Sequence, residues 1–152
     1  MANNYNTDVK QQYKMSWHNT FYELESFTYE PTKLIRNYAF MAYELSLTSS
    51  VKRGKHCALI LDEESNILEM FVNTYNDEGN NSIHAESGAI NNYFKKNERI
   101  DNCWMLVIRG NMLGDITMSR PCLNCYNNIK KHNIKKVVWS TGYMVFEGAY
   151  IK

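Results

Sequence analysis

Two short segments of this 152-residue chain carry side chains that could do chemistry together. His84 and Glu86 stand two residues apart in the first segment, and Cys122 and Cys125 stand three residues apart in the second. A catalytic zinc ion takes three protein ligands and keeps a fourth position open for water, and one imidazole with two thiolates meets that requirement. The sequence therefore predicts a Zn²⁺ site with His84, Cys122 and Cys125 as the metal ligands.

The expected helix starts would position these groups. Residues 82–86 are predicted to open one helix, with His84 in its first turn, and Pro121 suits the first position of another helix. At the start of a helix, the unpaired N–H groups and the helix dipole favour thiolate over thiol, which suits Cys122 and Cys125. Glu86 could then reach a water at the metal without ligating it. We therefore predict Glu86 as the catalytic proton shuttle.

The remaining apolar pattern predicts the scaffold. Apolar residues at steps of three and four predict an amphipathic helix from about Thr32 to residues 47–50. Apolar runs predict buried strands at 57–61 and 103–108. Further strands are predicted at 67–72, which would form a hairpin with 57–61, and at 137–139, with a possible fifth at 144–146 that would pair antiparallel with the fourth. Alternating helices and strands predict an α/β fold, a three-layer α/β/α sandwich with a mixed central sheet of about five strands.

Composition limits the possible partners and surroundings. Lys and Arg number 17 against 16 Asp and Glu, a net charge of +1 that argues against nucleic acid or an anionic membrane as the partner. No apolar run approaches the roughly 18 residues of a membrane-spanning helix. We expect a soluble, cytoplasmic protein, in which four cysteines suggest metal or catalytic groups more than disulfides. Cys57 and Cys103, in apolar runs, are interpreted as small core side chains.

The first thirty residues differ from the rest of the chain. They are polar and rich in tyrosine, and they lack clear periodicity. We expect residues 1–30 to form an N-terminal extension packed on a zinc domain of residues 31–152. The expected packing residues are Trp17, Phe21, Tyr22 and Phe27.

The spacing of the candidate ligands also matches a known signature. His-x-Glu followed by Pro-Cys-x-x-Cys is typical of zinc deaminases, and the chain has it at residues 84–86 and 121–125. From about Thr32 to Trp139 the chain resembles the cytidine and deoxycytidylate deaminase superfamily. The resemblance implies a cytidine deaminase-like fold and hydrolytic deamination of a cytosine nucleoside or nucleotide, of the cytidine, deoxycytidine or dCMP type. The product would be the uracil form, with release of ammonia.

The resemblance also implies roles for individual residues. Zinc would lower the pKa of its bound water, and the resulting hydroxide would attack the ring carbon that bears the amino group. Asn73 would hydrogen-bond a sugar hydroxyl, and the backbone N–H groups of Ala85 and Cys122 would contact the substrate and the metal-bound oxygen. Family members form oligomers, so we expect a homo-oligomer, a dimer or larger.

Three positions depart from patterns common in the family. Cys57 precedes Ala58 where a glycine is frequent, and Gly88 stands where deoxycytidylate deaminases often have asparagine. Both differences count against the nucleotide branch. Arg120 stands where adenine-type members commonly have glutamate, which favours cytosine as the base.

Alternative interpretations stay open at this point. A fourth ligand from His18, His56 or His132 would make the zinc structural, in a non-catalytic binding protein, although we favour surface or strand-edge positions for these histidines. Asn73 could simply end its strand, and Tyr75 or Tyr143 could stack on a base. A further alternative is a deaminase of polynucleotide (tRNA or single-stranded DNA) or of an amino-purine. The lysines that could support it, which we favour as solvated helix ends, are Lys95, Lys96, Lys130, Lys131, Lys135 and Lys136.

Overall fold

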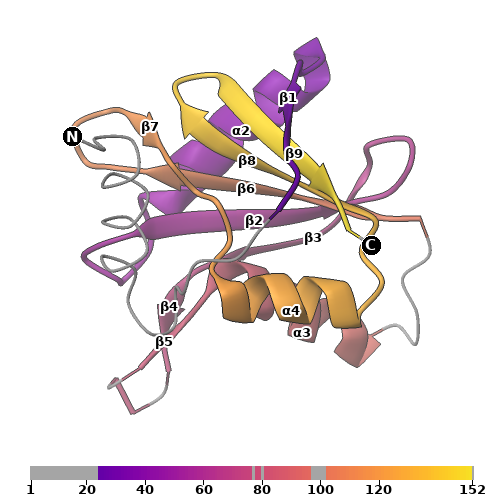
Figure 1. Cartoon of the computed structure of the whole chain (residues 1–152). Helices are drawn as coiled ribbons and strands as arrows, with labels where there is room; N and C mark the ends of the chain where they lie inside the picture. Colours follow the sequence, from indigo (N-terminus) through magenta and orange to yellow (C-terminus); the bar gives the residue numbers. More distant parts are fainter. Residues whose placement is uncertain (1–23, 77, 80, 97–101, 152) are drawn as a thin grey trace, which may run out of the picture.

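The computed structural model describes residues 24–76, 78–79, 81–96 and 102–151, which form a mixed sheet flanked by helices (Figure 1). The sheet order is β1-β9-β8-β6-β2-β3, and β7 also pairs with β6. The helices are α2 (Lys33–Ser46), α3 (Ala85–Lys96) and α4 (Leu123–Lys131). The strands are β1 (Phe27–Tyr29), β2 (Lys55–Leu61), β3 (Ile67–Val72), β4 (Thr74–Tyr75), β5 (Ser82–Ile83), β6 (Trp104–Gly110), β7 (Ile116–Thr117), β8 (Lys136–Gly142) and β9 (Val145–Tyr150).

Pairing in the sheet is mixed, as expected. Strand β2 is antiparallel to both β3 and β6, whereas β6 and β8 are parallel and are joined through α4. A parallel pair needs such a crossover connection, because the chain must return to the same end of the sheet. Strand β9 pairs antiparallel with β8, which confirms the predicted direction of the last strand.

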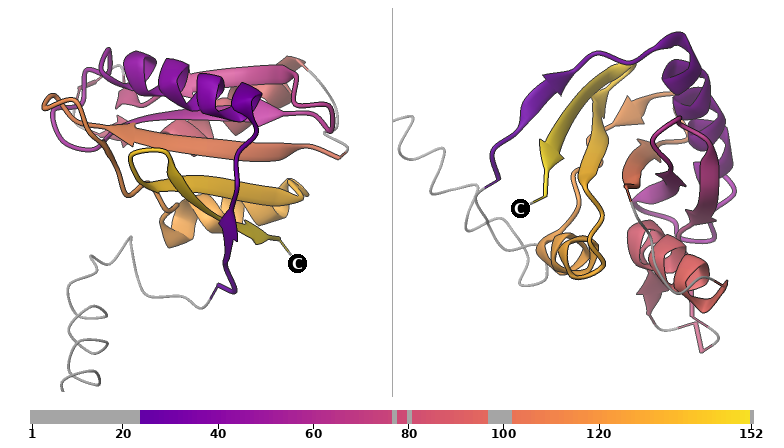
Figure 2. Two further views of the ribbon diagram at one scale, coloured as in Figure 1. Left: turned by 90° about the horizontal axis from the view of Figure 1, so that it is seen from above. Right: turned by 90° about the vertical axis from the view of Figure 1, so that its right-hand side faces the viewer.

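The helices form two outer layers. Figure 2 shows α2 on one face of the curved sheet and both α3 and α4 on the other. Side chains alternate along each strand, so Ala58 and Ile60 of β2 pack towards α3 and α4, while Cys57 and Leu59 pack towards α2. The three-layer α/β/α architecture is confirmed, and Cys57 and Cys103 are both fully buried in it.

The first helix begins where the sequence indicates. Thr32 has an extended backbone, and its hydroxyl accepts a hydrogen bond from the Ile35 N–H at 3.2 Å. A threonine in this position satisfies one of the N–H groups that a helix start leaves unpaired. Ile35, Ala39 and Ala42 then lie on the buried face of α2.

Several boundaries differ from the predicted ones. His84 precedes α3 instead of lying in its first turn, because Ser82–Ile83 pairs with Thr74–Tyr75 as a short strand and the helix begins at Ala85. Pro121 likewise lies two residues before α4, since Cys122 is extended (φ −71°, ψ 168°) and occupies the N-cap position of the helix. The sequence pattern also missed β1 and β7, which are only three and two residues long.

Part of the N-terminal segment joins the sheet. Strand β1 pairs antiparallel with β9, and the Phe27 ring stacks on that of Tyr150 at 5.2 Å between centroids. Trp17, Phe21, Tyr22 and His18 lie outside the described residues, so the packing of the extension stays a prediction. Within the described ranges, none of the helices has the length and apolar character needed to cross a membrane.

Candidate metal centre and active site

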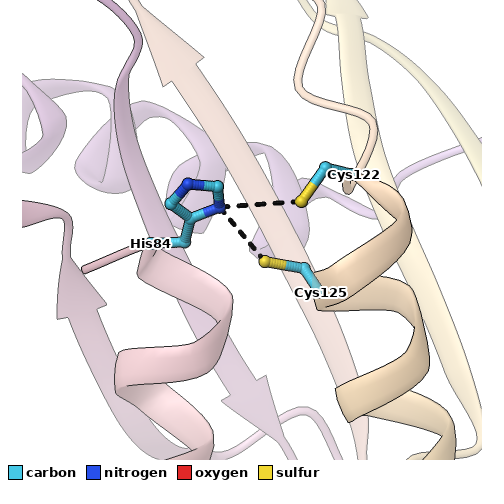
Figure 3. A group of neighbouring side chains, drawn as sticks. All are labelled: His84, Cys122 and Cys125. Atoms are coloured by element: carbon cyan, nitrogen blue, oxygen red, sulfur yellow. Dashed lines mark hydrogen bonds between the residues drawn. The ribbon is translucent and has the colours of Figure 1, made fainter. Parts of the chain in front are cut away.

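The three predicted metal ligands lie together. His84, just before α3, and Cys122 and Cys125, at the start of α4, point towards one another (Figure 3). The Nδ1 atom of His84 is 3.3 Å from Sγ of Cys125 and 3.7 Å from Sγ of Cys122. All three donor atoms lie within 4.8 Å of one another, which positions them to hold one metal ion.

The local backbone explains this convergence. Helices α3 and α4 lie side by side on the same face of the sheet, so their starts meet above its middle strands (Figures 1 and 2). The His84 carbonyl accepts the Gly88 N–H at 2.9 Å, and the Cys122 carbonyl accepts the Tyr126 N–H at 2.8 Å. Each ligand segment is therefore tied to the first turn of its helix, where the free N–H groups favour negative charge.

Hydrogen bonds among the three predicted ligands shift their pKa values. A hydrogen bond from the Cys125 thiol lowers the pKa of Cys122 to about 4 and correspondingly raises the pKa of Cys125. The hydrogen bond to Cys122 raises the pKa of His84. Thiolate is the form that binds a metal, so the site already stabilises one ligand in its binding form.

This donor set fits zinc in the catalytic type of site. Two thiolates and one imidazole are common zinc ligands, and a structural site would take a fourth ligand from the protein. Among the described residues, the cluster contains only His84, Cys122 and Cys125. His132 contacts the Asn128 carbonyl through Nδ1, and His56 contacts the Gly54 carbonyl, so neither completes the shell.

Glu86 stands beside this centre without belonging to the donor cluster. Its side chain lines the same cavity as His84 and Cys122, and the residue is only 5% exposed. Burial raises the pKa of its carboxyl to about 7. A buried carboxyl group of this kind can both accept and donate a proton near neutral pH.

A second row of contacts, which the sequence pattern did not identify, supports Cys125. The Ser87 hydroxyl lies 3.7 Å from Sγ of Cys125, and the Asn128 side-chain amide donates a hydrogen bond to the same hydroxyl at 3.4 Å. Ser87 belongs to α3 and Asn128 to α4, so this chain of contacts links the two helices behind the metal. Such outer contacts orient the ligands of a metal site.

Hydrogen bonds of Ser119 and Ser140 anchor the segment that leads into Cys122 to the strands of the sheet. Ser119 is buried, its hydroxyl donates to the Val107 carbonyl at 2.7 Å, and it accepts the Ser140 N–H at 2.8 Å. The Ser140 hydroxyl in turn donates to the Thr117 carbonyl at 2.7 Å. Only the tertiary structure brings these residues together, since they come from separate strands and a loop.

A cavity of about 310 Å³ opens in front of the metal centre, a size within the range of small-molecule sites. Ala85 and Asn73, the two predicted substrate contacts, both line it. The Asn73 amide also serves the backbone: its Oδ1 accepts the His56 N–H at 2.9 Å, and its Nδ2 donates to the Gly54 carbonyl at 2.6 Å. Its contact with a sugar hydroxyl therefore stays a prediction.

Two basic side chains of this cavity were not identified from the sequence. Arg53 and Arg109 join Arg120 in its lining, together with His56. His56 was expected to be an ordinary strand-edge histidine. Burial lowers its pKa to about 4, with Arg109 adding to the shift, so the ring is neutral at physiological pH. The only sequence signal for Arg53 and Arg109 is their place beside the ends of two apolar strands.

Other candidates lie elsewhere. Tyr75 and Tyr143 are exposed and do not line the cavity. The lysines at helix ends and in β8 do not line it either: Lys96 pairs with Glu69 at 3.3 Å, and Lys136 lies 4.4 Å from the centroid of the Trp104 ring. These lysines therefore do not form a phosphate patch at this cavity.

Comparison with known proteins identifies the family. The family model described as the cytidine and deoxycytidylate deaminase zinc-binding region matches residues 33–141. No curated protein sequence matches significantly.

Solved structures share the fold. A dCMP deaminase from the cyanophage S-TIM5, in its apo form, is similar with a TM-score of 0.57 and 23% identity, over 73% of this chain and 86% of that one. The same enzyme in complex with dCMP and dUMP has a TM-score of 0.55 and 22% identity, over 72% of this chain and 82% of that one. A cytidine deaminase from Burkholderia pseudomallei has a TM-score of 0.51 and 14% identity, over 67% of this chain and 81% of that one.

Proposed function

The chain belongs to the cytidine and deoxycytidylate deaminase family, and we propose that it is a zinc-dependent hydrolase that removes the amino group of a cytosine nucleoside or nucleotide. The observation that carries the proposal is one arrangement: three metal donors with a buried carboxyl group nearby, where two of the donors and the carboxyl group line one cavity of small-molecule size. His84, Cys122 and Cys125 would hold the zinc ion. When bound, zinc supplies a Lewis acid that lowers the pKa of a coordinated water to near neutrality.

The residues of the chain would provide the proton transfers and the orientation. Glu86 would take a proton from the attacking water, pass it to the ring nitrogen, and later help to protonate the leaving amine, so that ammonia departs. Its burial keeps bulk water from competing for that proton. The backbone N–H groups of Ala85 and Cys122 would orient the base at the metal centre, and Asn73 would bind a sugar hydroxyl.

A non-catalytic zinc protein of the same fold is disfavoured by two features. A closed shell of four protein ligands cannot activate water, whereas the cluster in the described ranges offers three. Burial of a carboxyl group at Glu86 is also unfavourable for stability, and a purely structural site gives no reason to retain it.

The direct test is ammonia release by the purified, zinc-loaded protein. The panel contains cytidine, deoxycytidine, their mono- and triphosphates, free bases, single-stranded DNA and tRNA. We expect turnover of at least one cytosine compound.

Glu86→Gln is the matched variant, because it keeps the shape of the side chain but cannot carry the proton. We expect it to lose turnover by at least about a hundredfold, in line with the contribution of a general acid–base group. Metal analysis should show the same zinc content as the wild type. Unchanged turnover in this variant would remove Glu86 from the mechanism. If the wild-type protein released no ammonia from any compound of the panel, the proposed activity would be contradicted.

A further inference from the structure

Two cavities meet beside the metal centre and share a positively charged wall. The first, of about 310 Å³, is the one that His84 and Glu86 line, and the second has a volume of about 390 Å³. Both cavities are lined by Arg53 and Arg109. These two arginines therefore stand at the junction between the metal-side cavity and the outer one.

The charge at this junction is unbalanced. Lys52 and Lys55 add to the lining of the outer cavity. Among the described residues, no carboxylate lines the outer cavity and Glu86 is the one carboxylate that lines the inner cavity. The ion pairs found in the described ranges involve other residues, so neither Arg53 nor Arg109 is paired with an acidic side chain of that part of the chain. The junction therefore favours an anionic ligand.

Both arginines are held on a fixed backbone. Arg109 is half-buried in β6, where it pairs in register with His56 of β2 and with Thr117 of β7. Arg53 precedes Gly54, which has a φ of +70° that suits glycine. The Gly54 carbonyl accepts hydrogen bonds from Nδ2 of Asn73 at 2.6 Å and from Nδ1 of His56 at 2.7 Å.

The two residues that pair in register with Arg109, His56 and Thr117, add no negative charge, and Thr117 offers a further polar contact. The His56 ring gives its Nδ1 proton to the Gly54 carbonyl and is uncharged. Thr117 lines the outer cavity, and its buried hydroxyl finds no hydrogen-bond partner within the described part of the chain. Arg120 is a weaker candidate, because its guanidinium lies over the Trp139 ring, 5.9 Å from the centroid.

We propose that the substrate carries a phosphate ester on its sugar and that Arg53 and Arg109 bind this phosphate where the two cavities meet. This inference rests on the proposed function. The planar guanidinium group donates two parallel hydrogen bonds to phosphate, and these are strengthened by a negative charge that a neutral nucleoside lacks. Without a phosphate, two cations would stay unmatched beside a site whose thiolates already offset the charge of zinc.

A small nucleotide fits better than a polynucleotide. The chain has a net charge of only +1, and the cavities have volumes suited to a small molecule. Polynucleotide binding needs many phosphate contacts along an extended basic surface. The departure at Gly88 does not oppose a nucleotide, because a Cβ there would meet the Phe71 ring at 2.2 Å and Gly88 does not line the cavity.

The test compares kcat/KM of the zinc-loaded protein for deoxycytidine, dCMP and a cytosine-containing oligonucleotide. We expect dCMP to exceed deoxycytidine by at least about tenfold. In Arg53→Gln and Arg109→Gln, this preference should fall by roughly 10- to 100-fold, as for the loss of a charge-assisted hydrogen bond. Arg36→Gln, an exposed arginine on α2, is the matched control and should keep the preference.

Calorimetric binding of dUMP and deoxyuridine separates this inference from the proposed function. Tighter binding of dUMP, weakened in Arg109→Gln but not in Arg36→Gln, supports the phosphate site even if no compound is turned over. Turnover of deoxycytidine with no preference for dCMP would overturn the phosphate site and leave the deaminase proposal intact. A preference for the oligonucleotide over dCMP would overturn the assignment to a small nucleotide.

Discussion

His56 shows how burial alone changes the chemistry of a side chain. The ring lines the inner cavity and is hydrogen-bonded to the Gly54 carbonyl. Loss of hydration disfavours its charged form, and the nearby Arg109 disfavours it further, so its pKa falls to about 4. The neutral ring therefore keeps one proton on Nδ1 and a lone pair on Nε2.

This shift makes stability depend on pH. The unfolded chain takes up a proton at His56 near pH 6.5, whereas the folded protein does so only near pH 4. Stability is therefore lost as the pH falls through this window. Between pH 7 and 5.5, His56 should account for a loss of about 1 kcal/mol in the free energy of unfolding.

The measurement is thermal unfolding of zinc-loaded wild-type protein and His56→Gln at pH 7 and 5.5. The variant should lose less stability over this interval than the wild type. His132→Gln, a histidine outside the cavity, serves as the control. An equal loss in wild type and His56→Gln would contradict the buried, neutral state of the ring.

Helices α3 and α4 are coupled through the residues behind the metal site. Asn128 of α4 donates to Ser87 of α3, and the Ser87 hydroxyl lies 3.7 Å from Sγ of Cys125. A hydroxyl group at this position stabilises the thiolate and fixes its direction. These contacts hold the starts of the two helices in a fixed relation to each other.

Removal of this contact should weaken metal binding. We expect Ser87→Ala to lower zinc affinity by roughly tenfold or more, as found for outer-shell partners of metal ligands. Competition with a chromogenic chelator measures this affinity without relying on activity. Asn91→Ala, an exposed position on the same helix, should leave zinc affinity unchanged. Wild-type affinity in Ser87→Ala would exclude a role for the hydroxyl in the site.

In the molecule as a whole, the metal site lies between two helices that pack side by side on one face of the sheet. His84 directly precedes α3, and Cys122 and Cys125 lie at the start of α4, whereas α2 on the opposite face contributes none of the ligands (Figures 2 and 3). A ligand that binds only the folded state stabilises it by mass action. Zinc should therefore stabilise one face of the molecule more than the other.

Chelation of zinc should lower Tm by an amount on the order of 10 °C, as expected from a linkage of about 3–4 kcal/mol in a domain of this size. Hydrogen exchange should rise most at the starts of α3 and α4 and least in α2. Cys122→Ser, which lacks one ligand, should show little further change on chelation. An equal rise of exchange in α2 and α3 would contradict this local role of the metal.

Most of the scaffold could be predicted because its signals are local. Thr32 caps α2, the apolar runs form β2, β3, β6 and β8, and the antiparallel return of β9 follows a short turn. The strands β1 and β7 escaped prediction because two or three residues carry no recognisable periodicity. Their pairing depends on neighbouring strands that are distant in sequence.

The sequence by itself determined which residues could bind zinc, since thiol and imidazole groups at this spacing suit few other roles. Only the tertiary structure decided what surrounds them. Arg53 and Arg109 are far apart in the chain, and they reach the same cavity because β2 and β6 are neighbours in the sheet. The Phe71 ring likewise leaves no room for a side chain at Gly88, because a Cβ there would overlap it as the ring is packed. Such contacts arise between strands and helices, so no local pattern records them.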